Sequence, residues 1–261
     1  MYLTESELKF SEEFINNGFI ISEISEMNSL NYISNFFINA IKKYSNKISC
    51  DHDIQSFLNK IHNQISIDQL NDFRLNLIDL MARDEKFRMH YYLISKNLLN
   101  IIVGNELVMQ NRVNLSIQFP NDDSSLLPIH ADTWSGDSPF EVVVWLPLVD
   151  CYDTKSMYIL PPNKMNLVEN LKSSKEQNKD LYDLVQKYVH WVKINYGQVM
   201  IFNQSLPHGN IVNQTYETRW SMNCRFKSLF SPYGDKGIGE FFEPITTKPI
   251  TKIGLKYKYP F

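Results

Sequence analysis

A change of residue pattern near Glu106 constrains the fold of this chain more than any other feature. Before it, apolar residues recur three and four positions apart over 29–47, 54–64, 68–80 and 86–102, as in helices that bury one face. After it, short runs of alternating apolar and polar residues are separated by prolines, which is typical of strands joined by loops. The sequence therefore predicts an α+β, mainly β fold, in which helices pack on an antiparallel barrel or sandwich.

The predicted β core covers 106–229, between a mostly helical part at 1–105 and a tail at 230–261. A polar helical insert at 166–188 interrupts the core. Neither an internal repeat nor a low-complexity linker divides the 261 residues, so a single domain is expected. The predicted strands are 107–119, 141–149, 156–160, 191–195, 198–203 and 216–229.

The first helix has signals at both ends. Thr4 followed by Glu7 forms a capping box, in which each side chain satisfies a free backbone donor of the other residue. The helix is expected to run to about Asn17 and to stop at Gly18. A short apolar strand is predicted to follow at 19–21.

Charge and cysteine content argue against several classes of protein. A net charge of -3 without long Lys or Arg runs gives no reason to expect a nucleic-acid partner. The acidic N-terminus does not resemble a secretory signal, and the most apolar long window, Tyr91–Val103, contains Lys96 and is too short to span a bilayer. Cys50, Cys151 and Cys224 form no CxxC pair, so buried thiols in a reducing cytoplasm are expected.

His130 and Asp132 are the first candidates for chemistry. Residues two apart in a strand point to the same face, so this imidazole and carboxylate can converge on one ion. The pattern alone is weak, because short motifs arise often by chance. The Asp-His-Asp run at 51–53 is such a case, and we interpret it as a solvated loop between helices.

A third candidate ligand strengthens this pair. A turn and an apolar strand occupy 197–203, and His208 follows at the expected start of the next strand. Taken alone, a histidine after Pro207 would be an ordinary loop residue. Two histidines and one carboxylate, however, occupy one face of an octahedral iron and leave positions open for oxygen chemistry. A structural zinc site would instead fill four tetrahedral positions, usually with cysteine.

The strand predicted after this histidine carries an alternating polar face of Arg219, Ser221, Asn223 and Arg225. If that face points into the barrel, a buried arginine requires an anionic partner. A dicarboxylate would supply one, because arginine offers a fork of donors and serine adds a hydroxyl. The alternative is an outward-facing polar strand edge.

Together, His130-x-Asp132, His208 and Arg219-x-Ser221 resemble the Fe(II)/2-oxoglutarate dioxygenases of the double-stranded β-helix (jelly-roll, cupin-like) fold. The resemblance implies that the three metal ligands hold Fe(II), and that Arg219 and Ser221 hold the distal carboxylate of the co-substrate 2-oxoglutarate. It implies a reaction in which O2 is consumed and 2-oxoglutarate becomes succinate while a C–H bond is oxidised. The protein itself would fix the ligands and exclude water.

More narrowly, the chain resembles the phytanoyl-CoA-hydroxylase-like branch, over 14–25 and 106–229. The segment 130–148 is similar to bacterial members encoded among surface-carbohydrate biosynthesis genes. This similarity implies a sugar or sugar conjugate as the substrate, and an acyl-CoA or an amino-acid derivative is the other choice. The residues it adds to the site are Trp145, Gln118 and Asn114 beside the co-substrate, and Trp134, Asp137 and Asn210 beside the substrate.

Several alternatives stay open. Related halogenases replace the carboxylate ligand by a small residue, so the presence of Asp132 favours hydroxylation or desaturation. Trp134 could be a core residue, and Asp137 could be a turn residue before Pro139. A metal-dependent, cupin-like isomerase or hydrolase would use the same three ligands without needing Arg219, and a silent binding domain would have lost a ligand. The oligomeric state is not predicted.

Overall fold

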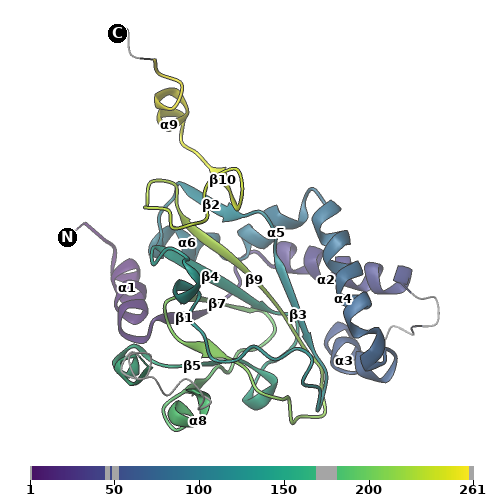
Figure 1. Ribbon diagram of the computed structural model, residues 1–261. Coiled ribbons are helices and arrows are strands. Elements are labelled where there is room, and N and C mark those ends of the chain that lie inside the picture. Colours follow the sequence, from purple (N-terminus) through teal and green to yellow (C-terminus); the bar gives the residue numbers. More distant parts are fainter. Residues whose placement is uncertain (1, 45–47, 49–52, 169–180, 259–261) are drawn as a thin grey trace.

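The structure is a computed structural model that describes residues 2–44, 48, 53–168 and 181–258 (Figure 1). Cys50, the first two residues of the loop predicted at 51–53 and most of the helical insert lie outside the described residues. Within the described part, Asp53 is the N-cap of the next helix, and α8 (Leu181–Val185) is the end of the insert.

Most strands form one antiparallel sheet of seven strands, in the order β1-β7-β4-β9-β2-β10. The ten-residue strand β9 organises it, because β9 pairs with β4 on one side and with both β3 and β2 on the other. The strands are β1 (Phe19–Glu23), β2 (Leu107–Gln110), β3 (Asn114–Gln118), β4 (Glu141–Pro147), β7 (Gln198–Asn203), β9 (Arg219–Ser228) and β10 (Phe242–Thr246).

A second, smaller antiparallel sheet has the order β6-β5-β8. Its strands are β5 (Tyr158–Ile159), β6 (His190–Trp191) and β8 (His208–Gly209). An isolated bridge between His130 and His208 adds one more residue to its edge. A cavity is lined by residues of both sheets, so it lies between them.

Helices at 27–44, 54–59 and 67–83 cover the outer face of the larger sheet, on the right of Figure 1. Trp220 of β9 is fully buried against Phe37 and Phe73, at ring distances of 5.9 and 6.0 Å, and donates its indole N–H to the Leu58 carbonyl. Burial of these aromatic rings fixes which face of β9 meets the helices. The helices are α1 (Glu5–Asn17), α2 (Met27–Tyr44), α3 (Ile54–Asn59), α4 (Ile67–Arg83), α5 (Phe87–Leu93), α6 (Lys96–Ile102) and α9 (Pro249–Gly254).

The N-terminal predictions are confirmed. Helix α1 begins with the Thr4–Glu7 capping box and ends at Gly18, whose φ of 74° lies in the left-handed region. The helical patterns at 29–47 and 68–80 correspond to α2 and α4. The pattern at 86–102 is two helices, because the chain turns between α5 and α6.

The predicted strands are present, with two differences. The run 107–119 is broken into β2 and β3, and the run 191–195 shrinks to β6 and an isolated bridge between Cys151 and Ile194. Strand β10, in the tail, was missed. It is short and contains Pro244, where its pairing with β2 shifts register, so its period-2 pattern is weak.

The thiols and the apolar segments agree with expectation where they are described. Cys151 and Cys224 are free and buried, and burial raises the pKa of each thiol to about 12, so both stay protonated at neutral pH. No helix in the described ranges is long and apolar enough to cross a membrane.

Candidate metal centre

The structure brings His130, Asp132 and His208 together, with their ligand atoms all within 4.8 Å of one another. The backbone sets this arrangement. His130 and His208 exchange two N–H···O bonds of 2.9 and 2.8 Å, and the Asp132 N–H donates to the Gln204 carbonyl at 3.1 Å. The prediction of a strand through 130–132 holds only for its first residue, because Asp132 starts the short 3-10 helix η2 (Asp132–Ser135).

Both histidines present the same nitrogen to the cluster. Nδ1 of His130 lies 2.8 Å from the Pro128 carbonyl oxygen, and Nδ1 of His208 lies 2.8 Å from that of Leu206. A carbonyl can only accept, so Nδ1 carries the proton in each ring and Nε2 keeps a lone pair for a metal. Burial, reinforced by the neighbouring His130, lowers the pKa of His208 to about 4, so this ring is neutral at physiological pH.

The donor set fits an open metal site. Two imidazole nitrogens and one carboxylate leave room for further ligands, and no cysteine belongs to the group. Within the part of the chain that the structure describes, no other group of three or more His, Cys, Asp or Glu side chains brings its ligand atoms this close together.

Arg219 is a buried cation at the same cavity. Its Nη1 donates to the Ser156 carbonyl at 3.2 Å and its Nη2 to the Ser116 hydroxyl at 2.9 Å, while its buried Nε has no partner. Burial lowers its pKa to about 10, so it remains charged at neutral pH. No described carboxylate lies within ion-pair distance, so a bound anion would compensate its desolvation.

The cavity between the sheets has a volume of about 200 Å³. The alternating face predicted for β9 points into it, because Arg219, Ser221, Asn223 and Arg225 all line it. The other predicted residues that line it are the three candidate ligands, Asn114, Trp145 and Asn210.

Three predicted site residues lie elsewhere. Gln118 has the register of the cavity face, opposite Arg219, but its amide donates to the Ile211 carbonyl at 2.8 Å and it does not line the cavity. Trp134 is 37% exposed and outside the lining. Asp137 is buried behind the lining.

Sequence reasoning missed Ser116 and the ion pairs of Arg225. Ser116 lies between Asn114 and Gln118 on the same strand face, so alternation was a usable signal for it. Arg225 Nη2 lies 2.9 Å from Asp132 Oδ1 and 3.3 Å from Asp137 Oδ2. No local pattern indicated that this arginine contacts the candidate metal ligand Asp132.

The loop after Asp132 is held by the C-terminal tail. Gly136 ends η2 with a φ of 90°, and a Cβ there would lie 2.2 Å from Asp235 Oδ2. We expect Gly136→Ala to destabilise the protein by about 1–3 kcal/mol, because alanine is strained at this φ. In the control Gly237→Ala, the added Cβ meets nothing within 4 Å, so about 0.5 kcal/mol or less is expected. Urea denaturation of both variants measures the difference, and equal midpoints would contradict it.

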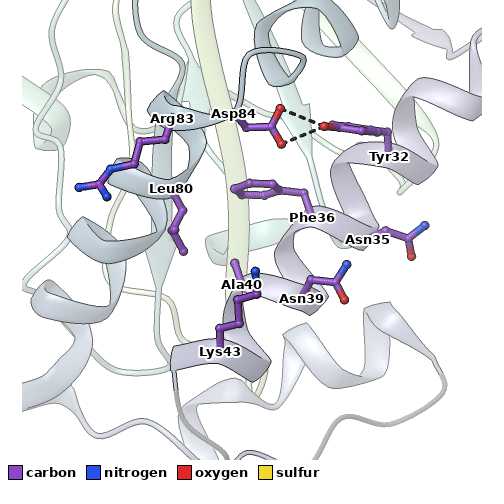
Figure 2. A pocket seen from close by; sticks show the side chains of 9 residues that line it. All are labelled: Tyr32, Asn35, Phe36, Asn39, Ala40, Lys43, Leu80, Arg83 and Asp84. Carbon is purple, nitrogen blue, oxygen red and sulfur yellow. Dashed lines mark hydrogen bonds between the residues drawn. The ribbon is translucent and has the colours of Figure 1, made fainter.

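A second cavity, of about 480 Å³, lies between α2 and α4, and its lining differs in chemistry from that of the cavity between the sheets (Figure 2). Tyr32 donates to both oxygens of Asp84, at 2.9 and 2.8 Å, which leaves that carboxylate fully engaged. The floor is apolar, with Phe36, Ala40 and Leu80. The lining contains no histidine or cysteine, so the cavity between the sheets is the site that offers metal chemistry.

No protein-family model and no curated protein matches the chain. Among solved structures, it is similar to the nickel complex of the non-heme monooxygenase ThoJ, at 14% identity over 93% of this chain and 85% of that one, with a TM-score of 0.51. It is similar to HygX from Streptomyces hygroscopicus with nickel and 2-oxoglutarate bound (13% identity, 87% and 88% covered, TM-score 0.53). It is also similar to EctD from S. alaskensis with 2-oxoglutarate and 5-hydroxyectoine, at 13% identity over 88% of this chain and 79% of that one, with a TM-score of 0.55. At these identities, the likeness shows that the chain shares the fold of these proteins.

Proposed function

We propose that this chain is an Fe(II)- and 2-oxoglutarate-dependent oxygenase on a double-stranded β-helix, with residues 1–261 forming one domain that acts in the cytoplasm. The observation that carries the proposal is the pairing of two sites in one cavity. At one, two imidazole Nε2 atoms and a carboxylate oxygen converge. At the other, Arg219 is a buried cation without a carboxylate partner. HygX and EctD, which share the fold, support the choice of metal and co-substrate, because HygX has been solved with iron and both have been solved with 2-oxoglutarate.

In this proposal His130, Asp132 and His208 hold iron, and Arg219 with Ser221 binds the distal carboxylate of 2-oxoglutarate. When bound, iron, 2-oxoglutarate and O2 supply the oxidation of a C–H bond, with release of succinate and carbon dioxide. The Pro128 and Leu206 carbonyls keep the proton on each Nδ1, and Ser116 and Ser156 hold the guanidinium in place. Trp145 and Asn114 line the same cavity.

The competing metal-dependent isomerase or hydrolase is less well supported. It would use the same three ligands, but it has no need for a buried arginine facing them. Anaerobic titration separates the two. An oxygenase of this kind should bind one Fe(II), and added 2-oxoglutarate should then give the weak visible charge-transfer band of the chelate. Iron binding without any 2-oxoglutarate binding would favour the isomerase or hydrolase.

For the substrate, we propose a sugar or sugar conjugate used in surface glycan biosynthesis, hydroxylated or desaturated at one carbon. The support is the sequence resemblance over 130–148, together with Asn210, which lines the cavity. Trp134 and Asp137 no longer contribute, since both lie outside the lining.

We expect sugar nucleotides or glycan fragments to stimulate succinate formation well above the uncoupled rate. Coupled oxidation should add one oxygen to the sugar, which mass spectrometry detects. Acyl-CoAs and free amino acids serve as the comparison panel. Stimulation by that panel, with none by the sugars, would show the carbohydrate assignment to be wrong while leaving the reaction class intact.

A further inference from the structure

Arg225 is the second cation of the cavity, and its surroundings differ from those of Arg219. Its side chain is 16% exposed, and its Nη2 contacts the carboxylates of Asp132 and Asp137. Its Nε is buried and has no hydrogen-bond partner. Arg225 lines the cavity with a side chain that is only partly buried.

The tail supplies the rest of this cluster. Lys236 Nζ lies 2.5 Å from Asp137 Oδ1, so Asp137 is shared between two cations. The ring of Phe241 lies 5.6 Å from the Arg225 guanidinium carbon and 4.6 Å from Lys236 Nζ. These contacts hold Arg225 beside the metal ligand Asp132.

The charges around the candidate metal ligands leave one positive charge in excess, both before and after the site is loaded. Asp132 and Asp137 are matched by Arg225 and Lys236. A divalent iron and a 2-oxoglutarate dianion cancel each other, so the charge of Arg219 remains in excess. Because unpaired charge in a partly desolvated cavity is costly, the loaded site favours one more negative charge. A bound iron would also attract the Asp132 carboxylate, which would weaken the ion pair between Asp132 and Arg225.

We propose that Arg225 binds an anionic group of the substrate, a carboxylate or a phosphate, next to the metal. This inference rests on the proposed function and deepens it, since it assigns a charge to the substrate and a residue that recognises it. Arg219 is the better partner for 2-oxoglutarate because no described carboxylate pairs with it, whereas Arg225 already has two. The fork geometry of the guanidinium suits either anion.

Binding titrations test this without turnover. The full chain is loaded with Ni(II) in place of Fe(II) and saturated with 2-oxoglutarate, and inorganic phosphate or acetate is then titrated in by calorimetry at constant ionic strength. We expect saturable binding of at least one probe, weakened about tenfold or more in Arg225→Gln and less in Arg225→Lys. Whichever probe binds more tightly distinguishes a phosphate from a carboxylate substrate. Arg74→Gln, a change on α4 at a residue that does not line the cavity, is the control and should match the unmodified protein.

The same titrations can overturn the proposal. The proposal is wrong if Arg225→Gln and the unmodified protein bind the probe with equal affinity. Phosphate that binds only to the nickel ion would give this result. Absence of saturable binding for both probes would overturn the proposal as well. If Arg225→Gln loses 2-oxoglutarate binding while Arg219→Gln keeps it, Arg225 is the co-substrate residue and only this inference fails. An unmodified protein that binds neither Ni(II) nor 2-oxoglutarate overturns the proposed function together with the inference, before any probe is added. Should Arg225→Gln not fold, Arg225→Lys decides, with an expected loss of about threefold.

Discussion

Replacing His208 by alanine is expected to abolish both the charge-transfer band of the Fe(II)–2-oxoglutarate complex and succinate formation. His208 supplies one of three converging ligands, and its Nδ1 bond to the Leu206 carbonyl aims Nε2 at the other two. Losing one ligand of three leaves too few contacts to retain iron. The protein should still fold, because the large core does not depend on an open metal site. Anaerobic spectroscopy and circular dichroism measure the two effects separately.

His190→Ala is the matched control. His190 lies in the same small sheet but is exposed and belongs to no ligand group. It should keep the band and the turnover of the unmodified protein. Full iron affinity and activity in His208→Ala would show that the assignment of the three ligands is wrong.

Arg219→Ala is expected to weaken 2-oxoglutarate binding by about 2–4 kcal/mol, the scale for losing one partner of a buried charged pair. Arg219 is 3% exposed, and among the described residues its hydrogen bonds go to Ser116 and Ser156, neither of which carries a charge. Iron affinity should change little, because the three ligands are untouched. Titration of 2-oxoglutarate into the iron-loaded protein, read from the charge-transfer band, gives the difference in affinity.

Arg225→Ala is the comparison, since this residue lies on the same face of β9. Its loss should affect 2-oxoglutarate less, because its guanidinium is already paired with Asp132 and Asp137. Normal 2-oxoglutarate affinity in Arg219→Ala, with a collapse in Arg225→Ala, would transfer the role to the second arginine.

The sequence by itself determined the features that depend on short stretches of chain. The capping box at Thr4 and the stop at Gly18 were readable because cap and turn geometry involve neighbouring residues. The inward face of β9 was readable because side chains alternate with a period of two. The grouping of the three candidate ligands was readable because His130 and Asp132 are two residues apart and His208 follows a recognisable strand.

The alternation of side chains along a strand did not predict correctly which residues line the cavity where a side chain could reach another partner. Gln118 has the register of the cavity face, yet its amide reaches the Ile211 carbonyl in a loop that the pattern does not position. Trp134 lies two residues after Asp132 but outside the cavity, because the loop expected there begins with the short helix η2. A one-dimensional pattern gives the face of a strand, not the path of the loops around it.

Only the tertiary structure decided how the charges around the candidate metal ligands are paired. Asp137 contacts Arg225 and Lys236, which are far along the chain from it, and Arg225 reaches Asp132 across the cavity. These contacts form because the tail packs back onto the sheet. Its strand β10 pairs with β2, and its Asp235 lies against the loop at Gly136. Ion pairs depend on distances of a few ångströms between separate segments, and such distances follow from how the sheets and the tail pack together.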